Sequence, residues 1–290
     1  MFESSRGLDP EVQARYLDRL GVGPEAPSVD ALRRLVRRHA ERVPYETWWI
    51  AAGERWDTDP VRAAERIALN GRGGYCYHLN GALGLLLSSL GYAVHGHVGG
   101  VQAGESSPAA MGNHLVLTVT GLPVETNPSG VWYVDAGLGD ALHEPLPLRP
   151  GEHVQAPFRL SLEPDGDRAW TLIHDPAGGF RSMRWTTARA SAGDFVAQHE
   201  WLSTAPESGF VQVPMAERRD ATGVDVIRTV TLARIGSGAF TAEPILRESE
   251  WFGVLADVFD LSFDGHPPEW RHRLWERVFA RYSAWQATRT

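Results

Sequence analysis

The segment around Cys76 combines the residue types that a cysteine nucleophile requires. Three glycines, Gly71, Gly73 and Gly74, lie just before it and permit a tight turn with unusual backbone angles. A leucine-rich helix is predicted to begin at or near Cys76, and a helix N-terminus stabilises the negative charge of a thiolate. The pattern predicts a reactive cysteine. The alternative is a buried cysteine with a purely structural role.

A histidine and an aspartate at strand ends are candidates to complete such a site. A cysteine nucleophile needs a base that accepts its proton and a third group that orients the base. His114 opens the β-rich run His-Leu-Val-Leu-Thr-Val, and Asp135 ends the run Val-Trp-Tyr-Val. Two neighbouring strands would hold these side chains together at a cleft. Taken separately, His114 is equally consistent with a hydrogen-bonded core histidine, and Asp135 with a turn-forming residue before Gly137.

A second pair of histidines, His95 and His97, alternates along a predicted strand, so both face one side. A metal site needs a third and a fourth ligand, and none stands at nearby spacing. The spacing therefore favours hydrogen-bonded strand histidines, and we expect no metal.

The predicted elements that must position these residues change from helices to strands and back to helices along the chain. Caps and helical periodicity predict helices that start at Asp9-Pro10, Ser28, Asp59-Pro60 and near Cys76. Short β-rich runs follow, at 92–98, 114–119, 131–134, 158–162, 169–174, 180–185, 210–214 and 224–233. A capping box at residues 191–194 predicts a helix that reaches residue 201, and the C-terminus returns to a helical pattern. Helices, then strands, then helices indicate an α+β chain.

Composition and charge narrow the class of protein further. The chain has 290 residues, with 28 Lys+Arg against 36 Asp+Glu and one cysteine. The acidic balance argues against a nucleic-acid partner, and one cysteine excludes both an intramolecular disulfide and a four-cysteine zinc site. The sequence opens without an apolar leader, and its most apolar stretch, 79–94, is too short and interrupted to cross a bilayer. We expect a soluble cytoplasmic protein with no membrane partner.

Five short segments match the motifs of one known family. They read Val-Pro-Tyr-Glu at 43–46, Arg-Gly-Gly-Tyr-Cys at 72–76, His-Leu-Val-Leu at 114–117, Val-Asp-Ala-Gly-Leu-Gly at 134–139 and Trp-Leu-Ser-Thr-Ala-Pro at 201–206. Asn80, shortly after Cys76, belongs to the second motif. In this combination, which runs over most of the chain, the sequence resembles the arylamine N-acetyltransferase family.

The resemblance implies a three-part α+β fold around a core that is similar to that of cysteine proteases. Residues 1–91 would form an N-terminal helical bundle that carries the nucleophilic cysteine. Residues 92–205 would form a central antiparallel β-barrel-like domain that carries the histidine and the aspartate. Residues 206–290 would form a C-terminal α/β lid.

The resemblance also implies ping-pong acyl transfer. Cys76 would take the acetyl group of acetyl-CoA, and a small aromatic amine or hydrazine would then remove it. His114 would act as the base and Asp135 would orient it. These are the three residues that the spacing alone proposes, but the acyl donor follows only from the resemblance.

Further residues receive roles from the same resemblance. The backbone near Gly137 and Gly139 would lie beside the pantetheine arm of the donor. Arg72 and Glu46 would form a structural ion pair that holds the cysteine loop.

Departures from the family pattern concern the substrate. Leu138 stands where the family often has a phenylalanine that lines the amine pocket, and Tyr45 stands where phenylalanine is usual. Thr47 replaces an asparagine, and two tryptophans follow it. The altered pocket keeps open an amide synthase, which joins an aryl amine to a polyketide or other acyl chain held on CoA or on a carrier protein.

Other readings also remain. The same three residues with water as acceptor would make a thioester hydrolase, and a non-enzymatic binding module would not need all three.

The basic run Arg33, Arg34, Arg37 and Arg38 is most simply a solvated helix face. The alternative is a patch that meets the phosphates of CoA or an acyl carrier protein. The acyl chain length, the amine and the oligomeric state are not set by the sequence.

Overall fold

The computed structural model describes residues 7–102, 110–236 and 241–288. Residues 1–6, which contribute to the expected lack of an apolar leader, lie outside the described residues. Among the described residues, no helix is both long enough and apolar enough to cross a membrane.

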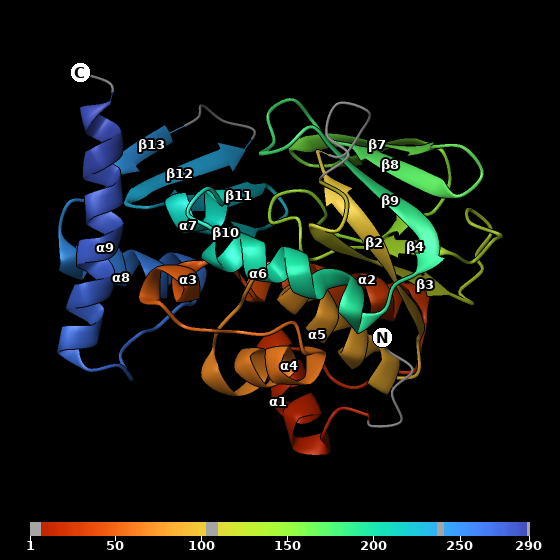
Figure 1. Ribbon diagram of the computed structural model, residues 1–290. Helices are drawn as coiled ribbons and strands as arrows, with labels where there is room; N and C mark the ends of the chain where they lie inside the picture. Colours follow the sequence, from red (N-terminus) through yellow and green to blue (C-terminus); the bar gives the residue numbers. More distant parts are fainter. Residues whose placement is uncertain (1–6, 103–109, 237–240, 289–290) are drawn as a thin grey trace.

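The N-terminal part is helical, as the caps predict. Its helices are α1 (Pro10–Leu20), α2 (Val29–Arg42), the short α3 (Trp48–Ala52), α4 (Pro60–Asn70) and α5 (Cys76–Ser89). Asp9 caps α1 by accepting a hydrogen bond from the backbone N–H of Glu11 at 2.9 Å, and Ser28 caps α2 through that of Ala31 at 3.1 Å. Figure 1 shows α5 above α4 and α1 and below the strands, and every residue of α5 from Cys76 to Leu87 is buried.

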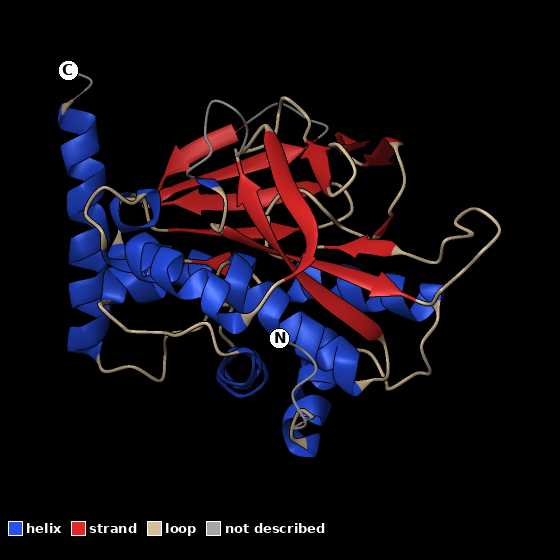
Figure 2. Cartoon of the chain, turned by 45° about the vertical axis from the view of Figure 1, so that its right-hand side comes forward, coloured by secondary structure: helices blue, strands red, loops and turns tan. Residues whose placement is uncertain are grey.

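The middle of the chain forms an antiparallel eight-stranded sheet in the order β5-β4-β3-β2-β9-β8-β7-β6. Its strands are β2 (Ala93–Val101), β3 (His114–Thr120), β4 (Trp132–Val134), β5 (Leu146–Pro147), β6 (Gly151–Gln155), β7 (Phe158–Pro164), β8 (Ala169–Ile173) and β9 (Ser182–Arg189). Figure 2 shows this sheet curving above the helices. The predicted α+β class with a barrel-like middle is confirmed.

Strand β3 is buried on both faces, and this fixes the direction of its first side chain. Leu115, Leu117 and Val119 pack into the core shared with the helices, whereas Val116 packs inside the barrel-like sheet. Because side chains alternate along a strand, His114 lies on the same side as Val116. The alternation therefore turns His114 away from the helix-packed face of β3.

The C-terminal part combines a second sheet with helices. Five antiparallel strands run in the order β1-β10-β11-β12-β13. They are β1 (Tyr45–Glu46), β10 (Met215–Arg219), β11 (Gly223–Arg228), β12 (Thr231–Gly236) and β13 (Thr241–Pro244). The helices are α6 (Val196–Thr204), which follows a short 3-10 turn (Ala192–Phe195), then α7 (Gly209–Gln212), α8 (Glu248–Phe259) and α9 (Pro268–Ala287). Helices α8 and α9 pack on Trp48 of α3 and on Ile227 of β11 in a third apolar core. The domain borders at 91 and 205 remain a prediction.

The predictions for two of the strands are wrong. Residues 210–214 were expected to be extended, but Gly209–Gln212 forms a helical turn because Ser208 caps it, with Oγ 3.2 Å from the backbone N of Phe210. The run 224–233 was expected to be one strand, but it is split into β11 and β12 by a reversal at Thr229, whose φ is +51°.

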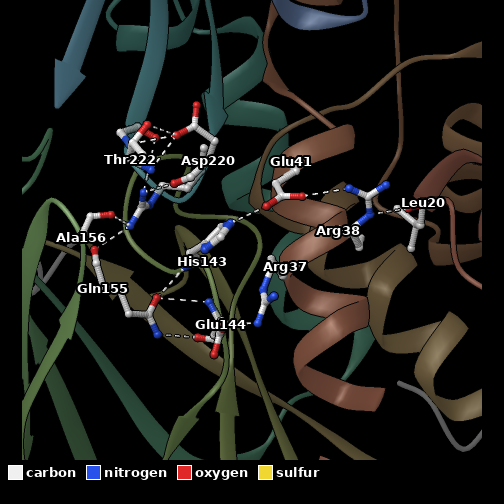
Figure 3. A network of polar contacts seen from close by, with 12 residues as sticks. Leu20, Arg37, Arg38, Glu41, His143, Glu144, Gln155, Ala156, Asp220 and Thr222 are labelled. Atoms are coloured by element: carbon white, nitrogen blue, oxygen red, sulfur yellow. Dashed lines mark hydrogen bonds and ion pairs between the residues drawn. The ribbon is translucent and has the colours of Figure 1, made fainter. Parts of the chain in front are cut away.

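A polar network joins α2 to the segment that follows β4 (Figure 3). Glu41 on α2 hydrogen-bonds with His143 Nε2 at 2.9 Å and accepts from Arg38 Nη1 at 3.2 Å. Arg37 pairs with Glu144. Arg33 and Arg34 pair with Asp30 and Glu25 in the same way, and all four arginine side chains stay 31–45% exposed, so the basic run is a solvated helix face whose charges are paired with carboxylates.

Gln155 at the end of β6 also belongs to the network that Figure 3 draws. Its Oε1 accepts from the backbone N–H groups of His143, at 2.7 Å, and Glu144, at 3.1 Å, and its Nε2 donates to the Glu144 carbonyl at 2.9 Å. The segment that begins at Asp135 is therefore anchored at its far end to both α2 and the barrel-like sheet.

Candidate active site

The loop before Cys76 is held by a close backbone approach and a buried ion pair. A Cβ atom added to Gly73 would lie 1.8 Å from the carbonyl oxygen of Pro44, so only glycine fits there. The N–H of Glu46 donates to the carbonyl of Gly74 at 2.9 Å. Arg72 Nε donates to Glu46 Oε1 at 2.9 Å, and both side chains are buried. The Arg72–Glu46 ion pair that the resemblance implies is present.

Cys76 is the first residue of α5, and its sulfur faces the start of β3. Tyr75 is the N-cap of this helix. Cys76 Sγ lies 3.4 Å from the carbonyl oxygen of Asn113, and the sulfur also interacts with the side chain of His114. The sulfur therefore lies at a helix N-terminus and beside a histidine side chain.

His114 is clamped between Cys76 and Asp135. Its Nε2 donates to Asp135 Oδ2 at 2.7 Å, which leaves Nδ1 as the ring nitrogen that can exchange a proton with the sulfur. Burial lowers the pKa of His114, but the charge and hydrogen bond of Asp135 and the contact with Cys76 outweigh burial and raise the pKa to about 10. The ring is therefore protonated at neutral pH, and the sulfur faces a positive charge.

The Asp135 carboxylate is surrounded by hydrogen-bond donors. Oδ1 accepts from Asn80 Nδ2 at 2.7 Å and from the Gly137 N–H at 2.9 Å. Oδ2 accepts from His114 and from the Tyr133 hydroxyl, the latter at 2.9 Å. These four hydrogen bonds fix the carboxylate in place behind the His114 ring.

Sequence reasoning assigned no role to Asn80 or Tyr133. Asn80 Nδ2 also donates to the Leu115 carbonyl at 2.6 Å, and its Oδ1 accepts from the Ala136 N–H at 2.8 Å. Asn80 therefore ties α5 to the strand ends that carry both His114 and Asp135. The sequence could have indicated a role for Tyr133, because Tyr133 lies two residues before Asp135 and residues two apart on a strand share a face.

A cavity of about 340 Å³ opens beside the sulfur. Its polar wall near the sulfur includes Cys76, His114 and Asn113, and its apolar wall is made by Tyr45, Val101, Leu138, Phe180, Leu202, Phe210 and Met215. Both residues predicted for the substrate pocket, Tyr45 and Leu138, thus line the same cavity as the sulfur. Three charged residues that sequence reasoning missed also line it, namely Asp140, Glu217 and Arg228.

The two glycines predicted for the donor site differ in position. Gly137 lines the cavity, and a Cβ atom added to it would lie 2.7 Å from Cys76 Cα and 2.9 Å from Asn80 Nδ2. Gly139 lines only a small neighbouring hollow, and its φ of +74° suits glycine. The structure therefore brings Gly137, but not Gly139, to the cavity beside the sulfur.

Both histidines of the pair on β2, His95 and His97, form hydrogen bonds with neighbouring strands. His97 Nδ1 lies 3.0 Å from the Ala188 carbonyl oxygen and Nε2 lies 2.8 Å from Thr118 Oγ1, while His95 Nε2 lies 3.4 Å from Thr120 Oγ1. In the part of the chain that the structure describes, no three His, Cys, Asp or Glu side chains gather as a metal site would require.

Comparison with known proteins gives the same family from sequence and from structure. The pattern of a family described as N-acetyltransferase matches residues 28–267. An arylamine N-acetyltransferase of Mycobacterium tuberculosis is 30% identical over 205 residues, which cover 68% of this chain and 70% of the relative.

Solved structures agree in fold over nearly the whole chain. The arylamine N-acetyltransferase of Mycobacterium marinum in complex with CoA has a TM-score of 0.80 and 26% identity, and covers 92% of this chain and 98% of its own. The Nocardia farcinica enzyme has a TM-score of 0.76 and 28% identity, with 91% and 93% covered. The family match, the relatives and the shared cysteine-protease-like fold agree: the chain belongs to the arylamine N-acetyltransferase family.

Proposed function

We propose that the protein transfers an acetyl group from acetyl-CoA to the nitrogen of an aryl amine or hydrazine through an acyl-enzyme on Cys76. The observation that carries the proposal is a cavity lined by Cys76 and His114, with Asp135 hydrogen-bonded behind the histidine. The CoA complex of the M. marinum relative and the names of the relatives supply the donor and acceptor classes. We place the reaction in the cytoplasm, where a lone cysteine stays reduced.

The geometry supports a two-step reaction. In the first step the Cys76 thiolate bonds to the acetyl carbonyl carbon, the bond from that carbon to the CoA sulfur breaks, and protonated His114 gives its proton to CoA. In the second step the amine nitrogen attacks the thioester, His114 accepts the proton that the amine loses, and Cys76 leaves as a thiolate. Asp135 holds the ring through Nε2 and stabilises its charged form.

The donor approaches the sulfur past Gly137 in this proposal. A residue with a side chain at this position would collide with Cys76 and Asn80. The bare backbone of Gly137 therefore lets this loop pack directly on Cys76 and Asn80, and its place beside the donor rests on its position in the cavity wall. A role for Gly139 beside the same arm remains a prediction from the resemblance.

The experiment that tests the proposal measures free CoA. Acetyl-CoA and longer acyl thioesters, including acyl carrier protein thioesters, are offered to the purified protein with a panel of aryl amines and hydrazines. We expect CoA release from acetyl-CoA to depend on the amine, with the N-acetyl product formed in equal amount. CoA release that is unaffected by amine would instead identify a thioester hydrolase. Transfer from longer or carrier-bound chains alone would identify an amide synthase.

Leu138 offers a prediction about the acceptor. An aromatic wall favours a flat ring by about 0.5–1.5 kcal/mol beyond area burial, and leucine lacks this contribution but leaves more room. Leu138→Phe should therefore raise kcat/KM for a small aniline by about threefold to tenfold and lower it for a bulky amine by overpacking.

The measurement is a two-by-two comparison of wild type and Leu138→Phe on a small and a large amine. The matched control is Leu246→Phe, because Leu246 is exposed and outside the cavity. If Leu138→Phe changes kcat/KM by the same factor for both amines, Leu138 does not shape the acceptor site.

A further inference from the structure

The cavity beside Cys76 holds a charged cluster that the proposed reaction does not use. Glu217 on β10, Arg228 at the end of β11 and Asp140 after β4 all line it. Glu217 is only 6% exposed, yet it borders the space in which the acceptor is proposed to bind. A buried carboxylate in a substrate cavity needs a partner, because burial of an uncompensated charge is costly.

Asp140 is already supplied with partners. Its Oδ2 accepts from the Gly179 N–H at 2.5 Å, and its Oδ1 lies 3.3 Å from His174 Nε2. The Asp175 N–H donates to His174 Nδ1 at 2.8 Å. Asp140 is therefore engaged by contacts within the fold.

Glu217 has fewer hydrogen-bond partners than Asp140. Oε1 accepts from Arg228 Nη2 at 3.3 Å, and Oε2 has no hydrogen-bond partner among the described residues. The Arg228 side chain is 46% exposed against 7% for that of Glu217, so solvent screens the cation more than the anion. Burial and the charge of Asp140 raise the pKa of Glu217 to about 8 although Arg228 lowers it. At pH 7 Glu217 is therefore largely protonated, and a cation bound at its free oxygen would favour the charged carboxylate.

The backbone around Glu217 keeps its free oxygen in place. A Cβ atom added to Gly139 would lie 2.0 Å from Glu217 Oε2, so the glycine leaves the space that this oxygen occupies. The strand pairing of Glu217 with Tyr45 fixes the other side of the residue. The loop that carries Asp135 and Leu138 is thus shaped around this carboxylate.

We propose that Glu217 is a specificity-determining residue that binds a cationic substituent of the acceptor, so that the preferred acceptors are aryl amines with a second, positively charged group. This inference rests on the proposed function. The apolar walls formed by Leu138, Phe180 and Phe210 suit an aromatic ring, with the reacting nitrogen toward Cys76 and the cationic group toward Glu217. An amidinium or guanidinium would donate to Oε2 in a charge-assisted hydrogen bond.

The test uses three acceptors that are nearly the same size and differ in charge. They are 4-aminobenzamidine, which is cationic, 4-aminobenzamide, which is neutral, and 4-aminobenzoate, which is anionic. The quantity measured is the ratio of kcat/KM for the amidine to kcat/KM for the amide, in wild type and in Glu217→Gln. Comparing the two proteins cancels the intrinsic reactivity of each amine. We expect the ratio to fall about tenfold to a hundredfold in Glu217→Gln, because a charge-assisted hydrogen bond is lost.

Glu243→Gln is the matched control, because Glu243 is an exposed glutamate on β13, away from the cavity. Its ratio should equal that of wild type. In Glu217→Gln the rate with 4-aminobenzoate should rise relative to the amide. A ratio that stays constant in Glu217→Gln, whatever happens to the absolute rates, would assign Glu217 a merely structural role and overturn the inference.

A second readout does not depend on transfer. Benzamidine, which lacks the reacting amine, should protect Cys76 from iodoacetamide at lower concentrations than benzamide does, and Glu217→Gln should remove this difference. If none of the three amines accepts an acetyl group, the protection experiment still decides the role of Glu217, and the wider panel of aryl amines and hydrazines decides the proposed function. Equal protection by benzamidine and benzamide in wild type would contradict the inference.

Discussion

Cys76→Ala is expected to lose acetyl transfer by about 10⁴-fold to 10⁶-fold, the range seen when a nucleophile or its partner is removed from other catalytic triads. The physical reason is that Cys76 is the only sulfur nucleophile in the chain. It sits at a helix N-terminus beside a protonated histidine. Cys76→Ser should be almost as inactive, because a serine hydroxyl ionises at far higher pH than a thiol.

Ser89→Ala is a suitable control for both variants, because Ser89 lies at the far end of the same helix and bonds only to the Leu86 carbonyl of its own turn. It should keep wild-type turnover. Iodoacetamide should inactivate wild type by alkylating one site. Retention of more than a few per cent of wild-type turnover in Cys76→Ala would remove the residue from the reaction.

Asp135→Asn is the second change with a large expected effect, a loss of about 10³-fold to 10⁴-fold, similar to or smaller than that of the corresponding change in serine proteases. Asn80 Nδ2 and the Gly137 N–H both donate to Oδ1, so the amide oxygen of the new asparagine must take that position. Its NH₂ group then faces His114 Nε2 and can only donate. The ring is forced to carry its proton on Nδ1, which faces Cys76, and the base is lost.

The pH dependence of alkylation gives a readout for Asp135 besides turnover. The pKa of His114 is about 10 largely because of Asp135, so removing the carboxylate lowers it toward the value that burial alone would give. In Asp135→Asn, His114 should therefore lose its positive charge at a lower pH than in wild type, so the pH dependence of inactivation by iodoacetamide should differ between the two proteins.

Asp167→Asn, in the exposed turn between β7 and β8, should match wild type in turnover and in the alkylation profile. An Asp135→Asn variant that shares the wild-type turnover and profile would show that the carboxylate does not tune His114.

The three residues of the candidate site were predictable because each lies in a local pattern. A glycine turn and a helix start mark Cys76, and strand ends mark His114 and Asp135. The contact between them depends on the β3–β4 pairing, in which Leu117 lies opposite Val134. Spacing along the chain makes such a pairing reasonable but does not establish it.

Elsewhere, local patterns were misleading or silent. Phe-Val-Gln-Val at 210–213 has the composition of a strand, yet the hydroxyl of Ser208 caps a helical turn there. The reversal at Thr229 uses a positive φ without the glycine or asparagine that usually marks one. The two-residue strand β1 is set by its pairing with β10, far away in sequence.

Glu217 shows why the acceptor end of the site could not be predicted. In the sequence it is one glutamate in a run of charged residues, Glu-Arg-Arg-Asp. Its burial follows from the pairing with Tyr45 and from the approach of Gly139, and both contacts are long-range. The residues near the sulfur are therefore marked by local motifs, whereas the charged residues of the cavity come together only when distant segments pack.

The most direct test of the central claim is to trap the acyl-enzyme. The protein is mixed with acetyl-CoA in the absence of amine, quenched in acid, digested and analysed by mass spectrometry. We expect one acetyl group, on the peptide that contains Cys76, and we expect added aryl amine to remove it and yield the N-acetyl product. Cys76→Ala should carry no acetyl group. An acetyl group found only on another peptide, or transfer to amine without any acyl-enzyme on Cys76, would contradict the mechanism.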